Sequence, residues 1–496
     1  MTQTLTKNKP SHYQEAIYQQ VITTTNNIAI SATAGSGKTT TLVEIAKLLP
    51  YGKRVLFAAF NKHIVNELKD RLPAGTDCFT MHSIGCKAIF NHYNTASISD
   101  NKQIRIIEPY FSDVKPKEKW GKIYEVDKLM RLARATMTKA NREEFNKLID
   151  TYALDIEEKN VEIAIKALRE LYRQNEERGT GSFTMDFMDM IEHCVLNQDV
   201  RMPQYDYILL DEAQDFSKLD HLFIDRLVRP IKGRRFIVGD KNQAIYSFRG
   251  SDPHSFETLI NKPNTVSLPL SISYRCAKSI VEEARKVYTD IESFEGNEEG
   301  EVIKKGKVES IEEGDMVVCR NTRPLIELFF MLVGMGKKAY VLGKDMEKGL
   351  LVMLSEFYGE DSTIDKIDQL QNHIDKIDNT LKQRGVTNPK KHLKYIAIEE
   401  KISILRLLFS KFTTISQVES FIMETFDDEE RSGIKLMTIH KSKGLECDNV
   451  YLIETFEGKK LIPSQYAVTK DQLTQENNLR FVATTRAKKK FVYLNL

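Results

Sequence analysis

The chain lacks the features that mark secreted, metal-binding and membrane proteins. Its six cysteines include no C-x-x-C pair, so neither a zinc site nor a disulfide framework is indicated. No uninterrupted apolar run approaches the length of a bilayer-crossing helix, and the N-terminus has no apolar core followed by a small-residue cleavage site. We therefore expect a soluble, cytoplasmic protein with reduced thiols and no membrane partner.

An excess of charge of either sign is also missing. The 72 Lys and Arg side chains almost balance the 70 Asp and Glu side chains, and the net charge is +2. A strongly basic domain would indicate a polyanionic partner, so any nucleic-acid binding must come from local groups of side chains. The 496 residues, of which 41% are hydrophobic, are enough for about three or four domains with their own cores.

Short apolar runs alternate with helical stretches along the chain, which is typical of parallel α/β sheets. The runs form two groups and therefore predict two α/β cores. The first group comprises 28–31, 55–59, 207–210 and 236–238, and the second comprises 316–319, 339–342, 449–452 and 491–493.

Each predicted core contains a mainly helical insertion, at 87–181 and at 345–428. Apolar residues at a spacing of three and four predict an antiparallel helical hairpin in the second insertion, broken at 384–389. This hairpin, at 364–409, is either a packing element or an arm that binds a protein partner. Its apolar positions are Ile364, Ile367, Leu370, Ile374, Ile377 and Leu381, then Leu393, Ile396, Ile402, Leu405 and Leu408.

The stretch from Ala32 to Thr39 reads Ala-Thr-Ala-Gly-Ser-Gly-Lys-Thr and lies between a predicted strand and a predicted helix. A glycine-rich loop in this context binds nucleotide phosphates through backbone N–H groups, with Lys38 on the β/γ oxygens and Thr39 on Mg²⁺. Because Ala32 replaces the usual first glycine, a coincidental glycine turn is the alternative. The predicted nucleotide-binding residues are Ala34, Gly35, Ser36, Gly37, Lys38, Thr39 and Thr40.

Two acidic residues, Asp211 and Glu212, directly follow the predicted strand 207–210. At the carboxyl end of a strand, Asp211 would hold Mg²⁺ and Glu212 would act as the general base that activates water. Two such residues alone are often only solvated. Together with the upstream loop, they predict hydrolysis of a nucleoside triphosphate.

The run Asp-Glu-Ala-Gln-Asp at 211–215 and the run from Val238 to Gly250 resemble motifs II and III of superfamily 1A DNA helicases, the UvrD/Rep/PcrA family. Further stretches resemble the other motifs of that family in the same order. They are Gln14, Phe60 to Lys62, Thr80 to Ser83, Tyr274 with Arg275, Thr438 to Glu446, and Val482 to Lys488.

The resemblance implies that ATP and Mg²⁺ are the cofactors. It places Gln14 on the adenine edge, Tyr274 on the base and Glu446 on the ribose. Three further residues, Gln243, Arg275 and Arg486, would meet the γ-phosphate as transition-state stabilisers, together with the catalytic Lys38, Asp211 and Glu212. Since Arg275 and Arg486 come from the second core, they would reach the nucleotide only when the cores close. Outside this motif set, both arginines would be expected to form ordinary surface salt bridges.

The resemblance also implies that single-stranded DNA lies across both cores. Phe60, Tyr246 and Phe248 would stack on bases, although each could instead be a core residue. The predicted contacts to phosphates and sugars are Asn61, Thr80, His82, Arg249, Thr438 and His440. We expect a monomer that binds single strands and single-strand/duplex junctions and moves 3′ to 5′.

In the family's arrangement, the chain is α/β with two RecA-like cores. Core 1A would comprise 1–86 and 182–254 around insertion 1B at 87–181, and core 2A would comprise 255–344 and 429–496 around insertion 2B at 345–428. Two residues depart from the family pattern, because Ser273 replaces Asn and Phe248 replaces Trp. The segment 58–62, followed by 78–83, resembles the helicase part of F-box DNA helicases and their bacterial and phage relatives more than it resembles UvrD itself, although no F-box precedes it.

Three functions fit these patterns to different degrees. The first is an ATP-dependent DNA helicase and translocase, and the second is an ATPase that clears proteins from single strands or recruits a partner. A P-loop kinase or switch GTPase would not require Gln243 together with Arg486. DNA repair, replication restart, phage or plasmid replication and defence against phage are all compatible settings.

Overall fold

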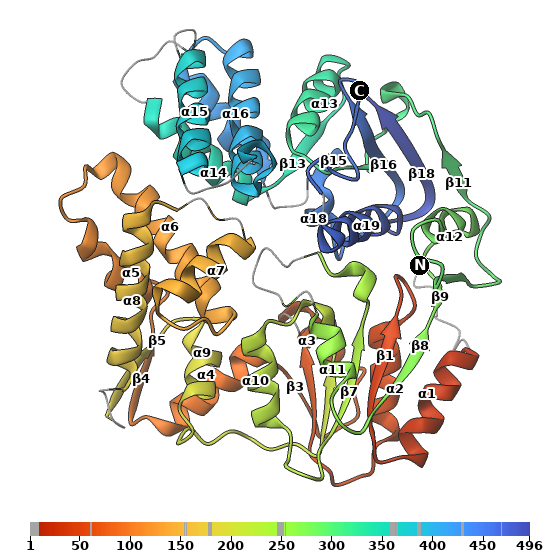
Figure 1. Cartoon of the computed structure of the whole chain (residues 1–496). Helices are drawn as coiled ribbons and strands as arrows, with labels where there is room; N and C mark the ends of the chain where they lie inside the picture. The colour runs from red at the N-terminus through yellow and green to blue at the C-terminus, as the bar shows by residue number, and fades with distance from the viewer. Residues whose placement is uncertain are drawn as a thin grey trace.

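The computed structural model describes residues 9–496 except 60–61, 153, 155, 177–180, 246–251, 253, 358–362, 364–365, 384–387, 428–430 and 468. Two parallel sheets form the centres of two lobes, and helical insertions lie to one side of them (Figure 1). This agrees with the expected α/β class. Within the described residues, no helix has the length and apolar character needed to cross a bilayer.

The first sheet has the strand order β3-β2-β6-β7-β1-β8, and all its pairs are parallel. Alternate residues of strand β2 enter different apolar clusters on the two faces of this sheet. Leu56 and Ala58 pack on one face, and Val55 and Phe57 pack on the other. Burial on both faces explains why these strands are continuous apolar runs. The strands are β1 (Asn27–Ala32), β2 (Val55–Ala59), β3 (Thr76–Thr80), β6 (Tyr207–Leu210), β7 (Arg234–Gly239) and β8 (Thr265–Leu270).

Helices cover both faces of this sheet (Figure 1). The first two begin with local signals: Ser11 and Gln14 form a capping box, and the glycine loop leads directly into the second helix. The helices are α1 (His12–Thr23), α2 (Lys38–Leu48), α3 (Lys62–Leu68), α4 (Met81–His92), α9 (Asp189–Leu196), α10 (Lys218–Leu227) and α11 (Ser255–Ile260), with short 3₁₀ turns η2 (Ala213–Asp215) and η3 (Lys241–Gln243).

Two expected boundaries differ from the strand pairing. Strand β8 pairs with β1, so the first core continues to Leu270 instead of ending at 254. Helix α4 crosses the expected boundary at residue 86, and its residues Ala88 and Ile89 belong to the first core's apolar cluster. The remaining boundaries stay predictions.

The first insertion is helical, as expected, but it is framed by a strand pair that the sequence did not predict. Strands β4 (Thr95–Ile98) and β5 (Ser182–Met185) pair in parallel where the chain leaves and re-enters the first core. Four-residue strands are too short to show a clear alternation. Between them lie α5 (Lys102–Ile107), the 3₁₀ turn η1 (Glu108–Phe111), α6 (Pro116–Ala135), α7 (Arg142–Tyr152) and α8 (Glu158–Glu176).

The second sheet has the order β11-β18-β16-β12-β15-β13-β14, with β17 antiparallel to β16 at one end. Its central strands also bury both faces, because Val317 and Val318 enter opposite clusters. The strands are β11 (Glu301–Ile303), β12 (Met316–Cys319), β13 (Ala339–Leu342), β14 (Phe426–Asp427), β15 (Ile434–Thr438), β16 (Cys447–Phe456), β17 (Lys459–Lys460) and β18 (Ala487–Asn495). A small pair, β9 (Ile272–Ser273) with β10 (Glu292–Ser293), precedes them.

The helices of this half are α12 (Lys278–Arg285), α13 (Arg323–Gly334), α18 (Ile439–Ser442) and α19 (Lys470–Thr484). The second insertion adds α14 (Lys344–Leu354), α15 (Ile367–Gln383), α16 (Leu393–Lys411) and α17 (Ile415–Thr425). Helices α15 and α16 lie side by side in Figure 1 and share one apolar cluster with the second sheet.

The burial pattern of the hairpin follows the predicted spacing in α15 and shifts in α16. Leu370, Ile374, Ile377 and Leu381 are buried, as are Ile402, Leu405 and Leu408, whereas Tyr395 and Ile398 replace Ile396 at the start of α16. Ile364 lies outside the described residues. The shared cluster supports a packing role for this hairpin. The two insertions touch, since a Cβ at Gly121 of α6 would lie 3.6 Å from Val352 of α14.

Candidate active site and nucleic-acid interface

The loop between β1 and α2 has the backbone shape of a phosphate cradle. Gly35 and Gly37 have φ angles of +70° and +79°, a left-handed conformation that glycine adopts without strain. Helix α2 begins at Lys38, so the free N–H groups of its first turn lie beside the loop. Ser36 is fully buried and donates a hydrogen bond to the carbonyl of Thr33, which fixes the loop from inside.

The acidic pair after β6 faces this loop. The Nζ of Lys38 lies 2.7 Å from Oε1 of Glu212, and the hydroxyl of Thr39 donates to Oδ2 of Asp211 at 2.6 Å. Glu212 has a φ of +52°, unusual for a non-glycine residue and typical of functional sites. The structure therefore brings together the four residues predicted to surround the phosphates and Mg²⁺.

The two neighbouring carboxyls have opposite pKa shifts. Burial would raise the pKa of Glu212, but Lys38 and then Lys443 outweigh it and lower the value to about 2. Burial and the adjacent Glu212 raise the pKa of Asp211 to about 6. Burial would lower the pKa of Lys38, yet the surrounding carboxylates raise it. A pair of acids with diverging pKa values is typical of catalytic sites.

A chain of amide hydrogen bonds extends from Glu212 to the end of β7. Gln214 donates to Oε2 of Glu212 at 2.6 Å and accepts the backbone N–H of Asp240 at 2.9 Å. Gln243 then donates to Oδ2 of Asp240 at 2.6 Å. Burial raises the pKa of Asp240 to about 6. The predicted Gln243 thus belongs to the same network as the acidic pair.

Arg486, at the end of α19, enters this network from the second core. Its Nη2 donates to Oε1 of Gln243 at 3.1 Å across 243 residues of sequence, and its other donors meet the carbonyls of Leu445 and Val482. Its side chain is 1% exposed. Burial, then the nearby Arg275, lower its pKa to about 10. The hydrogen-bond partners that the described residues give Arg486 are all neutral.

Lys443 forms a second bridge between the cores that sequence reasoning missed. Its Nζ lies 2.7 Å from both carboxylate oxygens of Asp215 and 2.6 Å from the carbonyl oxygen of Gln243. Burial lowers its pKa. Lys443 lies within the stretch from Thr438 to Glu446, and Asp215 lies within the acidic run 211–215. Both stretches were identified as motifs, but no sequence pattern indicates an ion pair between these two residues.

The segment before α12 packs directly on the phosphate loop. The N–H of Tyr274 donates to the carbonyl of Gly35 at 2.9 Å, and a Cβ on Gly35 would lie 2.5 Å from the Cβ of Arg275. Arg275 itself pairs with Glu446 at 2.6 Å, and Lys488 pairs with the other oxygen of that carboxylate at 2.7 Å. Glu446 therefore holds Arg275 in this structure, and its contact with a ribose stays a prediction.

The residues predicted to recognise the base lie next to the loop. Gln14 is buried, donates to Thr41 at 3.1 Å and accepts from Ser11, and its Nε2 would lie 4.0 Å from a Cβ on Gly37. The ring of Tyr274 lies 4.9 Å from that of Phe294. Two other predicted residues differ in exposure, since Ala34 is fully buried and Thr40 is exposed and accepts from Arg71.

The donor set fits a magnesium ion that arrives with a nucleotide. Within the described ranges, no group of three His, Cys, Asp or Glu side chains could hold a metal ion by itself. The adjoining oxygens of Thr39 and Asp211 are hard donors of the kind Mg²⁺ uses together with phosphates and waters. Burial and the neighbouring carboxylate of Glu212 raise the pKa of Asp211, and a bound cation would oppose both effects.

Two threonines predicted to contact nucleic acid occupy matching places in the two cores. Thr80 ends β3 and caps α4 by accepting the N–H of Ser83, and Thr438 ends β15 and caps α18 by accepting the N–H of Lys441. Both lie at the carboxyl edges of parallel strands. His440 is partly buried in α18.

His82 stacks on Phe187, a residue that the sequence analysis did not select. The ring centroids are 3.8 Å apart and the planes differ by 16°, while Phe187 remains 53% exposed. Helices α4 and α9 pack so closely at Gly85 that a Cβ on this residue would lie 1.6 Å from the carbonyl oxygen of Met190. Burial lowers the pKa of His82 to about 4. The predicted Phe60, Asn61, Tyr246, Phe248 and Arg249 lie outside the described residues.

Family models match both halves of the chain. Residues 13–264 match the UvrD/REP helicase N-terminal domain, and residues 337–494 match the UvrD-like helicase C-terminal domain. The chain belongs to the UvrD/Rep helicase family. This confirms the resemblance inferred from the motifs, and the two sheets are the two RecA-like cores of this family.

Of three curated relatives, two carry helicase names. The chain is 25% identical to F-box DNA helicase protein 1 of Schizosaccharomyces pombe, over 94% of this chain and 55% of that protein. It is 25% identical to DNA helicase II of Escherichia coli over 52% of this chain and 38% of that protein, and 23% identical to Gabija protein GajB of Bacillus cereus over 62% and 67%. The chain spans about half the length of the F-box helicases that it matches.

Proposed function

We propose that this chain is an ATP-dependent DNA helicase that moves along single-stranded DNA, 3′ to 5′, by closing and opening its two cores. One observation carries the proposal: Arg486 of the second core is buried against Gln243 of the first, beside Lys38 and the acidic pair, and has only neutral partners. Among the described residues Arg486 has no direct ion pair, and the carboxylates of Glu212 and Asp240 act on it without a hydrogen bond, which fits a site whose anion is a ligand. The family's direction of movement supports the 3′ to 5′ assignment.

The first step is an exchange of partners at the phosphate loop. Lys38 leaves Glu212 when a phosphate takes its place. Thr39 and Asp211 would hold Mg²⁺, and the ion would neutralise phosphate charge. Glu212 is then a free carboxylate beside the γ-phosphate position. A carboxylate released from Lys38 becomes a stronger base than it is in the ion pair, so Glu212 is able to orient a water and accept its proton.

Hydrolysis requires both cores. Arg486 and Arg275 supply positive charge where it develops on the transferred phosphoryl group, as an arginine finger does in cis. For this step Arg275 leaves its ion pair with Glu446 and binds phosphate instead. Gln14, Tyr274 and the released Glu446 then contact the nucleoside. The seam that Arg486, Lys443 and Tyr274 make with the first core is therefore sensitive to the nucleotide state.

The strand would cross the carboxyl edges of both sheets. Thr80 and Thr438 lie at equivalent ends of β-strands in the two cores. A change in the separation of the cores therefore changes the distance between two contacts to the same DNA strand. The exposed ring of Phe187, stacked on His82, offers a face to a base. Phe60, Asn61, Tyr246, Phe248, Arg249 and His440 remain proposed contacts.

The deciding experiment measures the rate of ATP hydrolysis with poly-dT, duplex DNA, single-stranded RNA or no nucleic acid. We expect stimulation by poly-dT, with an affinity that falls steeply as salt concentration rises. Lys38→Ala serves as the inactive control. Strand separation on duplexes with a 3′ or a 5′ tail, measured beside displacement of a bound protein from a single strand, distinguishes a helicase from a clearing ATPase. A rate that poly-dT leaves at its basal value would contradict the proposal.

A further inference from the structure

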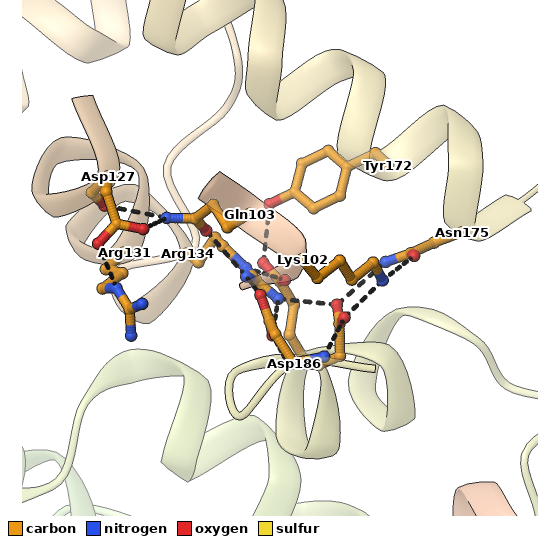
Figure 2. Close-up of polar contacts among 10 residues, drawn as sticks. Lys102, Gln103, Asp127, Arg131, Arg134, Tyr172, Asn175 and Asp186 are labelled. Atoms are coloured by element: carbon orange, nitrogen blue, oxygen red, sulfur yellow. Dashed lines mark hydrogen bonds and ion pairs between the residues drawn. The ribbon is translucent and has the colours of Figure 1, made fainter. Parts of the chain in front are cut away.

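A second buried ionic network lies where the first insertion meets the first core, away from the nucleotide site. Arg134 of α6 is 0% exposed, and its guanidinium meets three carboxylates. Its donors lie 2.6 Å from Asp186, 2.8 Å from Asp189 and 2.6 Å from Glu192. Figure 2 shows Arg134 beside Asp186. A helix of the insertion is thus ion-paired to the start of α9, a helix of the first core.

The insertion also holds these carboxylates from two further helices. Lys102 of α5 donates to Asp189 at 2.6 Å, and Asn175 of α8 donates to the same side chain at 3.1 Å. The hydroxyl of Tyr172 on α8 donates to Glu192 at 2.8 Å. Since α5, α6 and α8 all contribute, the network fixes the insertion as a unit against α9 (Figure 2).

The segment 186–189, which Arg134 contacts, forms a turn closed by two hydrogen bonds. The N–H of Asp186 donates to Oδ2 of Asp189 at 2.9 Å, and the N–H of Asp189 donates to Oδ1 of Asp186 at 2.7 Å. Phe187 lies inside this turn, yet its ring is exposed and stacked on His82. The same two carboxylates that close the turn are the ones that Arg134 binds.

We propose that Arg134 is a positioning residue for single-strand binding, because it links the helical insertion to the turn that presents Phe187. This inference rests on the proposed function. The planar guanidinium reaches three carboxylates at once, which a lysine ammonium on a flexible stem would not do in the same geometry. Loss of Arg134 would remove the ion pair that the described residues give Asp186 and leave Asp189 with Lys102, so repulsion between the two carboxylates would loosen the turn.

The test compares Arg134→Met, Phe187→Ala, the double variant and Arg226→Met as the matched control. Arg226 of α10 donates to the carbonyls of Asn197 and Val200 beyond the opposite end of α9, so its loss perturbs the same helix away from Phe187. For each protein, the poly-dT concentration that gives half-maximal ATPase stimulation is measured below the melting temperature. Fluorescence of 2-aminopurine in the strand reports base stacking.

We expect Arg134→Met to raise the half-maximal poly-dT concentration by about tenfold, the effect of losing one stacked base, with an unchanged rate without DNA. The double variant should bind no more weakly than Phe187→Ala, because both changes act on one contact. Arg226→Met should bind like the unmodified protein.

Wild-type-like binding by Arg134→Met, or additive effects in the double variant, would overturn the inference and leave the proposed function standing. Absence of any poly-dT stimulation in the unmodified protein would overturn both. Should Arg134→Met not fold, Asp186→Asn is measured in the same way, since it keeps an acceptor for Arg134 and removes one charge.

Discussion

Two arginines are buried to the same extent in this protein and have opposite surroundings. Arg134 is 0% exposed and lies among three carboxylates, which outweigh burial and raise its pKa. Arg486 is 1% exposed, has neutral partners, and has a pKa lowered to about 10 by burial and the nearby Arg275. Arg134 is hydrogen-bonded to carboxylates, whereas the described residues give Arg486 only neutral hydrogen-bond partners.

The difference separates structural from functional burial of charge. A buried ion is tolerated when it is paired and fully hydrogen-bonded, whereas an unpaired one destabilises the fold unless a ligand supplies the opposite charge. Burial alone would give both arginines the same significance. Their partners indicate that Arg134 maintains a shape and that Arg486 is available to an anion.

The largest effect should come from Arg486→Ala, which removes the unpaired cation. We expect turnover to fall by a factor on the order of 10³, with nucleotide binding largely retained, because the guanidinium acts mainly on transition-state charge. Rapid-quench kinetics together with fluorescent-nucleotide titration measure the two quantities separately. Unchanged turnover would contradict its assignment as a finger in cis.

The second test compares stability at the two positions. Arg134→Met should lower the free energy of unfolding by about 3–5 kcal/mol, since it removes the ion pairs that the described residues give the buried Asp186 and Glu192 and leaves Asp189 with Lys102. Arg486→Met removes an uncompensated charge, so its cost should be much smaller. Urea unfolding of both variants without nucleotide gives the two values. Equal losses would show that the two environments are energetically alike.

A smaller effect concerns pH next to the Arg134 network. Burial lowers the pKa of His193 to about 4, and its ring lies 2.7 Å from the hydroxyl of Tyr93. The folded state keeps this ring neutral, whereas the unfolded chain takes up a proton near pH 6.5, so stability falls as the pH decreases from about 6.5 to 4. At pH 5 this contributes a loss of about 2 kcal/mol.

Urea unfolding at pH 7 and pH 5, with His193→Gln as the comparison, measures that contribution. Glutamine does not titrate, so the variant should lose less stability than the unmodified protein between the two pH values. An identical loss in both proteins would exclude His193 as its source.

Local signals explain what could be predicted from the sequence. Lys38, Thr39, Asp211 and Glu212 follow their strands directly, and parallel strands bring such positions to one edge of a sheet. Strand β8 escaped prediction because Pro269 interrupts its pattern, which is tolerable since β8 is an edge strand.

Contacts between distant residues could not be predicted in the same way. Lys443 and Asp215 are 228 residues apart, and the partners of Arg134 come from α5, α9 and the turn before α9. A single sequence shows charged residues but not which of them meet. Phe187 was missed for a similar reason, because its exposure and its stack on His82 depend on how α4 packs against α9.

The chain passes from one core to the other only once within the described strands. Strand β8 of the first sheet ends at Leu270, and β9 begins at Ile272, so a single residue, Ser271, separates them. So short a tether gives each core an effective concentration toward the other on the order of millimolar or more. Polar contacts too weak to hold two separate proteins together are thus enough to close this pair, and weak contacts are also the ones that a single nucleotide can reverse.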